Sequence, residues 1–264
     1  MNGMTGPRII VTADDLALDS RTTRAIVQSL HDGLTSHASL LANMPGCEEA
    51  CQQVRAGGLE HQIGVHFNLT QGAPLTEGMR RRKEFCVDGM FEPRRFWTGL
   101  MPLSNEISRV VADEARAQII AARAQGMPVG HLDSHNDVHL LPGILRIAVA
   151  VAREFEIWRI RPARNCGTRR GALRRVLHHS CNGWLYLQGL MRVRYFGTIE
   201  DVRWLIARKK PGAVISAEIM THPRLGDNDA IIDAPSPDLL AVRLRGLQPG
   251  GSVDQPTAPD GRRG

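Results

Sequence analysis

The sequence predicts a single α/β domain in which helices wind around a parallel sheet. Its 264 residues are 42% hydrophobic, which is enough for one large core, and single α/β barrels commonly have about 250 residues. Short apolar or β-branched runs alternate with stretches of helical periodicity. Four of the polar clusters come at the ends of predicted strands, and parallel α/β folds bind ligands at the carboxyl ends of their strands.

Each strand is predicted from a short apolar run that ends in polar or turn residues. The predicted strands are 8–12, 39–43, 62–69, 129–133, 157–161 and 213–220. The helices are predicted from apolar residues at helical spacing, most clearly where Val111, Ala115 and Ile119 share one stripe. The predicted helices are 20–32, 46–57, 105–125, 143–155 and 199–208, with a short one within 236–246. This alternation favours crossover connections and therefore a parallel sheet.

Residues 1–247 are expected to form this one domain. The segment 71–103 holds glycines, prolines and the basic run "RRRK", and we expect a lid-like excursion there rather than a regular element. The arginine-rich region after residue 161 has no clear pattern. Residues 248–264 are rich in Pro, Gly, Asp and Arg, which predicts a disordered tail.

The net charge is +6, mostly from arginine. We interpret the basic runs as solvated surface, with attraction of an anionic ligand as the alternative. No nucleic-acid-binding module is recognisable, so no nucleic acid partner is expected. The five cysteines are scattered and odd in number, which is typical of idle thiols in a reducing compartment. The start of the chain is unlike a signal peptide and no run is long enough to span a membrane. We therefore expect a cytoplasmic protein that has no membrane partner.

The four polar clusters at strand ends are "TADD", "GVHFN", "HLDSHNDVH" and "MTHP". The adjacent carboxylates of Asp14 and Asp15 repel each other unless a cation, a donor or a proton intervenes. Capping of the next helix by Asp15 or Asp19 is the structural alternative. Four such clusters at equivalent strand ends indicate one shared site.

A divalent ion could be bound by the imidazoles of His66 and His135 and by one carboxylate. Its remaining coordination positions would stay open for water and substrate. Such an ion polarises a carbonyl and lowers the pKa of a bound water. Asp14 would accept the proton of that water, and His222 would protonate the leaving group. The structural alternatives are a satisfied core histidine at His66 and a capping or loop histidine at His222. No G-x-S-x-G, P-loop or G-x-G-x-x-G motif is present.

The stretch "HLDSHNDVH" has His or Asp at every second position. Five such side chains on one strand face would be too polar for a core, so we predict a strand that becomes a loop. His131 and Asp133 would end the strand and orient a metal ligand. The side chain of His135 would point into the site as that ligand. Asp137 and His139 would lie further along the loop, at the rim of the site.

The chain resembles the YdjC-like carbohydrate deacetylase family at four places in the family's order. The matching segments are "IVTADDLALD", "IGVHFNLTQGAPL", "HLDSHNDVHLLPGI" and "AEIMTHP". The resemblance implies an irregular TIM-like (β/α) barrel and removal of an N-acetyl group from an amino sugar or chito-oligosaccharide. It also implies one divalent ion, such as magnesium or zinc. The chain could act alone or as a homodimer.

Carried over position by position, the metal ligands match Asp15, His66 and His135. Asp14 matches the base and His222 the general acid. The substrate contacts would come from Arg161, Asp137 and His139, and Arg161 could meet a carboxylate or phosphate.

Three departures from the family pattern stand out. Leu16 and Ala17 replace the usual Phe and Gly, and Asp137 replaces a usual histidine. The C-terminal part is expected to be incomplete. A sugar-binding or regulatory homologue with weakened catalysis therefore stays an alternative, as does a metal-dependent sugar isomerase or phosphoesterase on a similar barrel.

Overall fold

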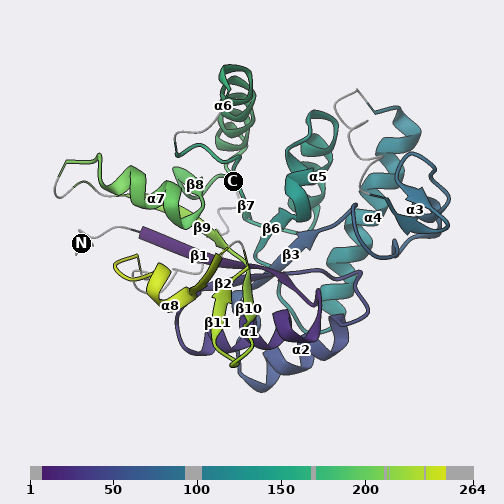
Figure 1. Ribbon diagram of the computed structural model, residues 1–264. Coiled ribbons are helices and arrows are strands. Elements are labelled where there is room, and N and C mark those ends of the chain that lie inside the picture. Colours follow the sequence, from purple (N-terminus) through teal and green to yellow (C-terminus); the bar gives the residue numbers. More distant parts are fainter. Residues whose placement is uncertain are drawn as a thin grey trace, which may run out of the picture.

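The computed structural model describes residues 8–92, 103–167, 171–210, 213, 215–234 and 236–247. At its centre is a curled sheet of seven parallel strands (Figure 1), in the order β7-β6-β3-β2-β1-β9-β8. The strands are β1 (Arg8–Leu16), β2 (His37–Leu40), β3 (Ile63–Phe67), β6 (His131–Ser134), β7 (Arg159–Ile160), β8 (Tyr195–Gly197) and β9 (Ser216–Thr221). The predicted barrel-like α/β fold is confirmed as a half-barrel whose edge strands are β7 and β8.

Helices surround this sheet (Figure 1). They are α1 (Ser20–His31), α2 (Cys47–Ala56), α3 (Glu77–Arg80), α4 (Asn105–Ala124), α5 (Pro142–Glu154), α6 (Ala172–Leu187), α7 (Ile199–Ile206) and α8 (Leu240–Arg243). Their starts follow local chemistry, because the side chains of Asp19, Ser104 and Thr198 cap α1, α4 and α7. Pro142 stands at the first position of α5, where its missing N–H costs nothing.

Several elements differ from the sequence prediction. The region after residue 161 contains α6 and β8, which the sequence pattern missed. The short helix expected within 236–246 is β12 (Ser236–Leu239) followed by α8, and β12 pairs with β11 (Ile231–Asp233), which also pairs with β10 (Pro223–Leu225). The segment 71–103 contains α3 and a small hairpin of β4 (Cys86–Val87) and β5 (Met90–Phe91). Residues 93–102 and the tail 248–264 lie outside the described residues.

The two faces of the curled sheet differ in chemistry. On one face, strand residues such as Ala38, Val65 and Ile160 are buried with the apolar faces of the helices. Alternate residues on the other face pair with one another. Thr12 donates to Glu218, and Ser39 donates to Asp133. Since side chains alternate across a strand, the interior of the half-barrel is polar and its outer face carries the apolar core.

Contacts across this interior require the sheet to curl. Arg161, which follows β7, bonds to Glu218 on β9 and to Asp14 on β1. β7 is an edge strand, four strands away from β1 in the sheet order. Because neighbouring strands are about 4.8 Å apart, a flat sheet would keep these side chains out of reach of one another.

Gly64 on β3 leaves space in this interior for the buried ring of His131. A Cβ built on Gly64 would lie 2.4 Å from Cδ2 and Nε2 of His131. We expect Gly64→Ala to destabilise the fold by about 1–3 kcal/mol, the usual cost of overpacking, as measured by urea unfolding. Adding His131→Ala should recover part of that loss.

Gly78→Ala is the matched control, because a Cβ there meets only Val110 Cγ2 at 3.9 Å. It should not show a loss of this size. If Gly64→Ala is as stable as wild type, the ring of His131 does not fill the interior in the way described.

No helix in the part of the chain that the structure describes has both the length and the apolarity to cross a membrane.

Candidate metal centre and active site

A bulge in β1 presents Asp14 and Asp15 to the same site. Ala13 pairs with Ala38 and Leu16 with Leu40, so β1 has one residue more than its neighbour over this stretch. Asp15 takes a φ of 71°, a left-handed conformation that Asp tolerates better than most residues. A regular strand would send adjacent side chains to opposite faces, and the bulge removes that restriction.

Asp19, and not Asp15, caps helix α1, with its side chain 2.8 Å from the N–H of Thr22. Asp14 and Asp15 are therefore available for another purpose, although they are only 3% and 8% exposed. Ala17 has a φ of 78°. It stands where the resemblance predicts glycine, and it keeps a backbone conformation that costs about 1 kcal/mol or more for a residue with a Cβ.

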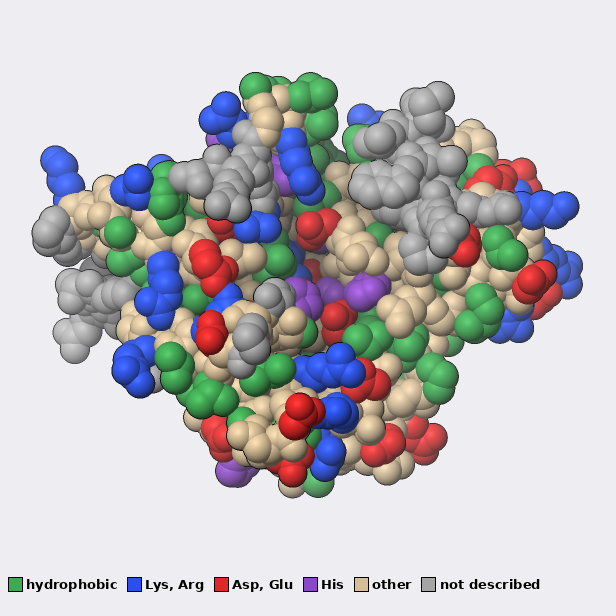
Figure 2. Space-filling view, viewed as in Figure 1, with side chains coloured by type: hydrophobic (Ala, Val, Ile, Leu, Met, Phe, Trp, Pro, Cys, Tyr) green, Lys and Arg blue, Asp and Glu red, His purple; other side chains and the backbone are tan. Residues whose placement is uncertain are grey.

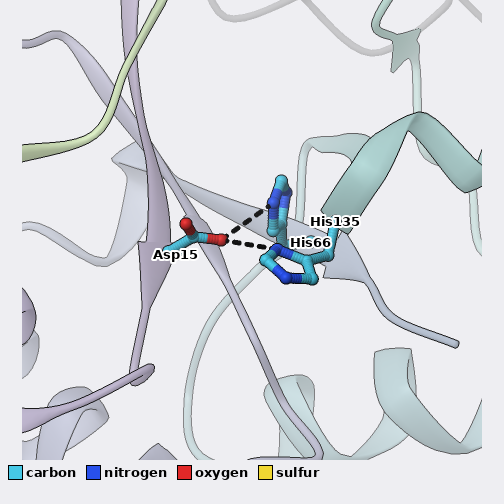
Figure 3. A group of neighbouring side chains, drawn as sticks. All are labelled: Asp15, His66 and His135. Atoms are coloured by element: carbon cyan, nitrogen blue, oxygen red, sulfur yellow. Dashed lines mark hydrogen bonds and ion pairs between the residues drawn. The ribbon is translucent and has the colours of Figure 1, made fainter. Parts of the chain in front are cut away.

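The side chains of Asp15, His66 and His135 meet at the ends of β1, β3 and β6 (Figure 3). Asp15 Oδ1 lies 3.3 Å from His66 Nε2 and 2.8 Å from His135 Nδ1. One donor atom from each residue lies within 4.8 Å of the other two. The structure thus brings together the three residues that the sequence proposed as metal ligands.

Asp133 fixes the orientation of the His66 ring. Its Oδ1 lies 2.7 Å from His66 Nδ1, and its Oδ2 accepts a bond of 2.6 Å from Ser39 Oγ. Binding of Nδ1 by a carboxylate directs Nε2 toward Asp15, which is the usual arrangement of a histidine that ligates a metal.

The site is built to hold charge although it is buried. Burial opposes ionisation of Asp15, but the hydrogen bonds of His135 and His66 outweigh it and keep the pKa of Asp15 well below its usual range. Burial acts to lower the pKa of His66, yet the charge and hydrogen bond of Asp133, together with Asp15, raise it to about 10. The carboxylates around His66 therefore favour a positive charge at this ring, and a proton or a bound cation can supply it.

The charges of the buried cluster fit a divalent ion. Its members among the described residues are the carboxylates of Asp14, Asp15, Asp133 and Glu218 and the guanidiniums of Arg159 and Arg161. With neutral imidazoles the cluster is two positive charges short of balance, and buried charge is costly unless it is balanced. One divalent ion at Asp15, His66 and His135 would supply that balance with donors that such ions accept.

A second group of donors, Asp14, His66 and Asp133, is also compact enough for an ion. Arg161 already takes this place, because its guanidinium lies 2.7 Å from each oxygen of Asp14 and 2.6 Å from Asp133 Oδ2. The set containing Asp15 is therefore the better candidate for a metal site.

Arg161 corrects one expectation from the sequence. It is 2% exposed, and Asp14, Asp133 and Glu218 neutralise its charge. The guanidinium has no free charge for a carboxylate or phosphate of a substrate. It holds Asp14 in place instead. Burial raises the pKa of Asp14, while Arg161 and His66 act against that shift.

His139 corrects a second expectation. It is fully buried, with Nδ1 2.5 Å from Ser134 Oγ and Nε2 3.0 Å from the carbonyl oxygen of Arg161. Both ring nitrogens have protein partners, so this ring supports the loop and does not reach a substrate. Asp137, in the 3₁₀ segment η3 (His135–Leu140), is half-buried with a φ of 57°, and its contact with substrate stays a prediction.

His222 lies directly after β9. Ala13 pairs with Thr221, which places His222 next to the level of Asp14 on the neighbouring strand. Its N–H donates to Asp233 Oδ1 over 2.8 Å, so the backbone is fixed. Its half-buried ring makes no hydrogen bond within the described residues, which leaves the imidazole to meet a ligand.

Figure 2 shows histidine side chains at the bottom of a hollow in the middle of one face, with acidic and basic side chains around it. The family described as YdjC-like protein matches residues 8–249. The chain belongs to the YdjC-like family. This assignment agrees with the resemblance seen in the four sequence segments.

Three curated relatives of this YdjC-like protein carry the name carbohydrate deacetylase. The relative from Brevibacillus brevis is 31% identical over 153 residues, which are 57% of this chain and 57% of the relative. That from Geobacillus stearothermophilus is 29% identical, covering 86% and 80% of the two chains. The human relative is 27% identical, covering 82% and 74%.

One solved structure shares the fold. It is a protein from Enterococcus faecalis, described as a candidate for cellobiose-phosphate cleavage, with a TM-score of 0.65 and 21% identity. The match covers 93% of this chain and 91% of the other. At this identity the likeness supports the fold alone.

The sequence reasoning missed three residues of the buried network, namely Ser39, Arg159 and Glu218. Each lies two residues from another polar residue: Ser39 follows His37 on β2, Arg159 on β7 precedes Arg161, and Glu218 follows Ser216 on β9. Polar residues at every second position of predicted strands were the available signal, because in this fold that face lines the interior of the half-barrel.

Proposed function

We propose that this YdjC-like protein is a hydrolase that removes an N-acetyl group from an amino sugar or chito-oligosaccharide. The observation that carries the proposal is the convergence of Asp15, His66 and His135 at the ends of three strands of one sheet, β1, β3 and β6, beside the carboxylate of Asp14. The curated relatives are named carbohydrate deacetylase, which supports a carbohydrate substrate and a deacetylation reaction.

Asp15, His66 and His135 would hold one divalent ion. When bound, such an ion polarises the acetamide carbonyl and makes water nucleophilic near neutral pH. Two imidazole nitrogens and one carboxylate favour zinc or a similar transition metal over magnesium, which prefers oxygen donors.

The other side chains would then divide the proton transfers. Asp14, held by Arg161, accepts the proton of the attacking water. His222 donates a proton to the amine that leaves. Asp133 keeps His66 oriented, and Asp137 at the rim would contact the sugar.

The test is acetate release from N-acetylglucosamine and chito-oligosaccharides, after chelation and with separately added zinc, magnesium, manganese or nickel. Activity should disappear with the chelator and return with at least one ion. Metal content is measured in the same samples.

Full acetate release by metal-free protein would contradict the metal centre. Stoichiometric metal binding with no acetate from any substrate would favour a sugar-binding homologue. Release of phosphate or an isomerised sugar instead of acetate would favour the alternative enzymes.

A further inference from the structure

His222, the proposed general acid, stands just beyond the sheet. The pairing of β1 with β9 ends at Ala13 and Thr221, so the sheet does not fix the residue that follows. The backbone of His222 bonds to a later part of the chain. Its N–H donates to Asp233 Oδ1 over 2.8 Å, and its carbonyl oxygen accepts from the N–H of Ala234 over 2.8 Å. The position of His222 therefore depends on residues that follow β9.

Asp233 is a buried carboxylate that an ion pair holds in place. It is 3% exposed and lies on β11, opposite Pro223 on β10. While its Oδ1 accepts from His222, its Oδ2 accepts from the guanidinium of Arg243 on α8. Burying a carboxylate is costly unless the charge is paired, and Arg243 supplies the opposite charge. Asp233 thus has one oxygen for the active site and one for its anchor.

Helix α8 gives this anchor a fixed place. Leu240 and Leu244 of α8 are buried in a second apolar cluster, together with Ile9 of β1 and Val202 of α7. Figure 1 shows α8 beside β11, near β1, and the two elements are in contact. Arg243 lies between the two leucines in the sequence, and its side chain is 12% exposed. The apolar cluster therefore supports the ion pair that reaches the active site.

We propose that Arg243 and Asp233 are positioning residues that hold His222 within reach of the amine that leaves. This inference rests on the proposed deacetylation, and it gives the C-terminal segment 223–247 a part in the site. Asp233 bonds to the backbone of His222, which leaves the imidazole ring available to carry the proton. Proton transfer requires hydrogen-bond reach, and a misplacement of about 1 Å can lower a rate by about 10²-fold.

Arg243→Met tests the proposal, because it removes the guanidinium and keeps an apolar side chain at this position. In folded, metal-loaded protein it should lower the turnover number for acetate release by about 10–100-fold, with little change in KM. Arg243→Lys keeps the charge and should recover part of the turnover. Arg245→Met is the matched control. Arg245 is exposed and lies two residues later, so this variant should keep the turnover of wild type.

A double-mutant cycle separates positioning from general damage. If Arg243 acts through His222, Arg243→Met should lower turnover little further in a chain that already carries His222→Ala. A substitution that merely weakened the fold or the metal centre would lower turnover by the same factor in both backgrounds. Equal factors would overturn the proposal, and so would an Arg243→Met chain as active as wild type.

Hydrogen exchange measured by NMR gives a readout that does not depend on the reaction. The amide of His222 should exchange faster in Arg243→Met than in wild type, because Asp233 is no longer held against it. Arg245→Met should leave this exchange unchanged. Unchanged exchange in Arg243→Met would overturn the positioning even if the chain releases acetate. Faster exchange in a chain whose wild type releases no acetate would support the positioning of His222 and contradict the proposed function.

Discussion

Asp14→Asn is expected to lower the turnover number for acetate release by about 10²–10⁴-fold, the usual contribution of a general base. Metal content should stay near that of wild type, because the proposed ligands Asp15, His66 and His135 are unchanged. The reason is chemical: an amide of similar shape cannot accept a proton from water.

The structure adds a second effect of this substitution. Each oxygen of Asp14 accepts a bond of 2.7 Å from Arg161, and an asparagine offers one oxygen in place of two. Leaving a buried donor without its partner costs about 1–3 kcal/mol. Turnover must therefore be expressed per folded, metal-loaded chain, with unfolding measured in urea.

Asp15→Asn is the matched control, one residue away in the same bulge. It removes a proposed ligand, so it should lose metal together with activity. Retained turnover in folded Asp14→Asn would contradict the role of base, and normal metal content in Asp15→Asn would contradict the role of ligand.

The order of strands and helices was predictable because each outer strand face and helix stripe is apolar. Val65 and Ile160 illustrate this, since the sequence shows them as strand residues and the structure buries them against helices. Helix α6 was not predictable in the same way. Its exposed side carries Leu173, Val176 and Leu187, while one of its two buried residues is the polar Asn182. The sequence therefore lacks the contrast between faces on which the prediction depends.

The site was predictable as far as its residues follow strands. The ends of β1, β3 and β6 bring Asp15, His66 and His135 together because the parallel strands of one curled sheet end at the same edge. The alternation in "HLDSHNDVH" proved to be a strand followed by the segment η3. His139 was wrongly predicted to contact substrate. The positive φ values of Asn136 and Asp137 turn the chain back into the core, and the local sequence pattern does not predict these φ values.

Arg161 was misjudged because its environment is made by distant parts of the chain. Asp14, Asp133 and Glu218 come from three strands, and only the curl of the sheet brings them to one guanidinium. Sequence shows the charge of a residue but not which charges will oppose it. The same network gives the largest stability effect that we expect.

Arg161→Met should destabilise the fold by about 3–5 kcal/mol, because it leaves buried carboxylates without their cation. It should also abolish acetate release, since Asp14 loses the group that holds it. Urea unfolding and turnover measure the two effects. Arg161→Lys keeps the charge but not the paired bonds to Asp14, and it should fall between wild type and Arg161→Met.

Arg159→Met is the matched control, two residues earlier on β7 and equally buried. Arg159 bonds to Glu218 over 3.2 Å, while its Nε and Nη2 have no partner among the described residues. Glu218 would keep its bonds to Arg161 and Thr12, so this loss should be smaller by about 2 kcal/mol or more.

A divalent ion separates a charge effect from a packing effect. Without Arg161 the cluster has a larger excess of negative charge, so added zinc should raise the unfolding midpoint of Arg161→Met more than that of wild type. A variant damaged only in its packing would gain no more from the ion than wild type does. Equal stability of the two methionine variants, with or without the ion, would show that Arg161 does not hold the carboxylates as described.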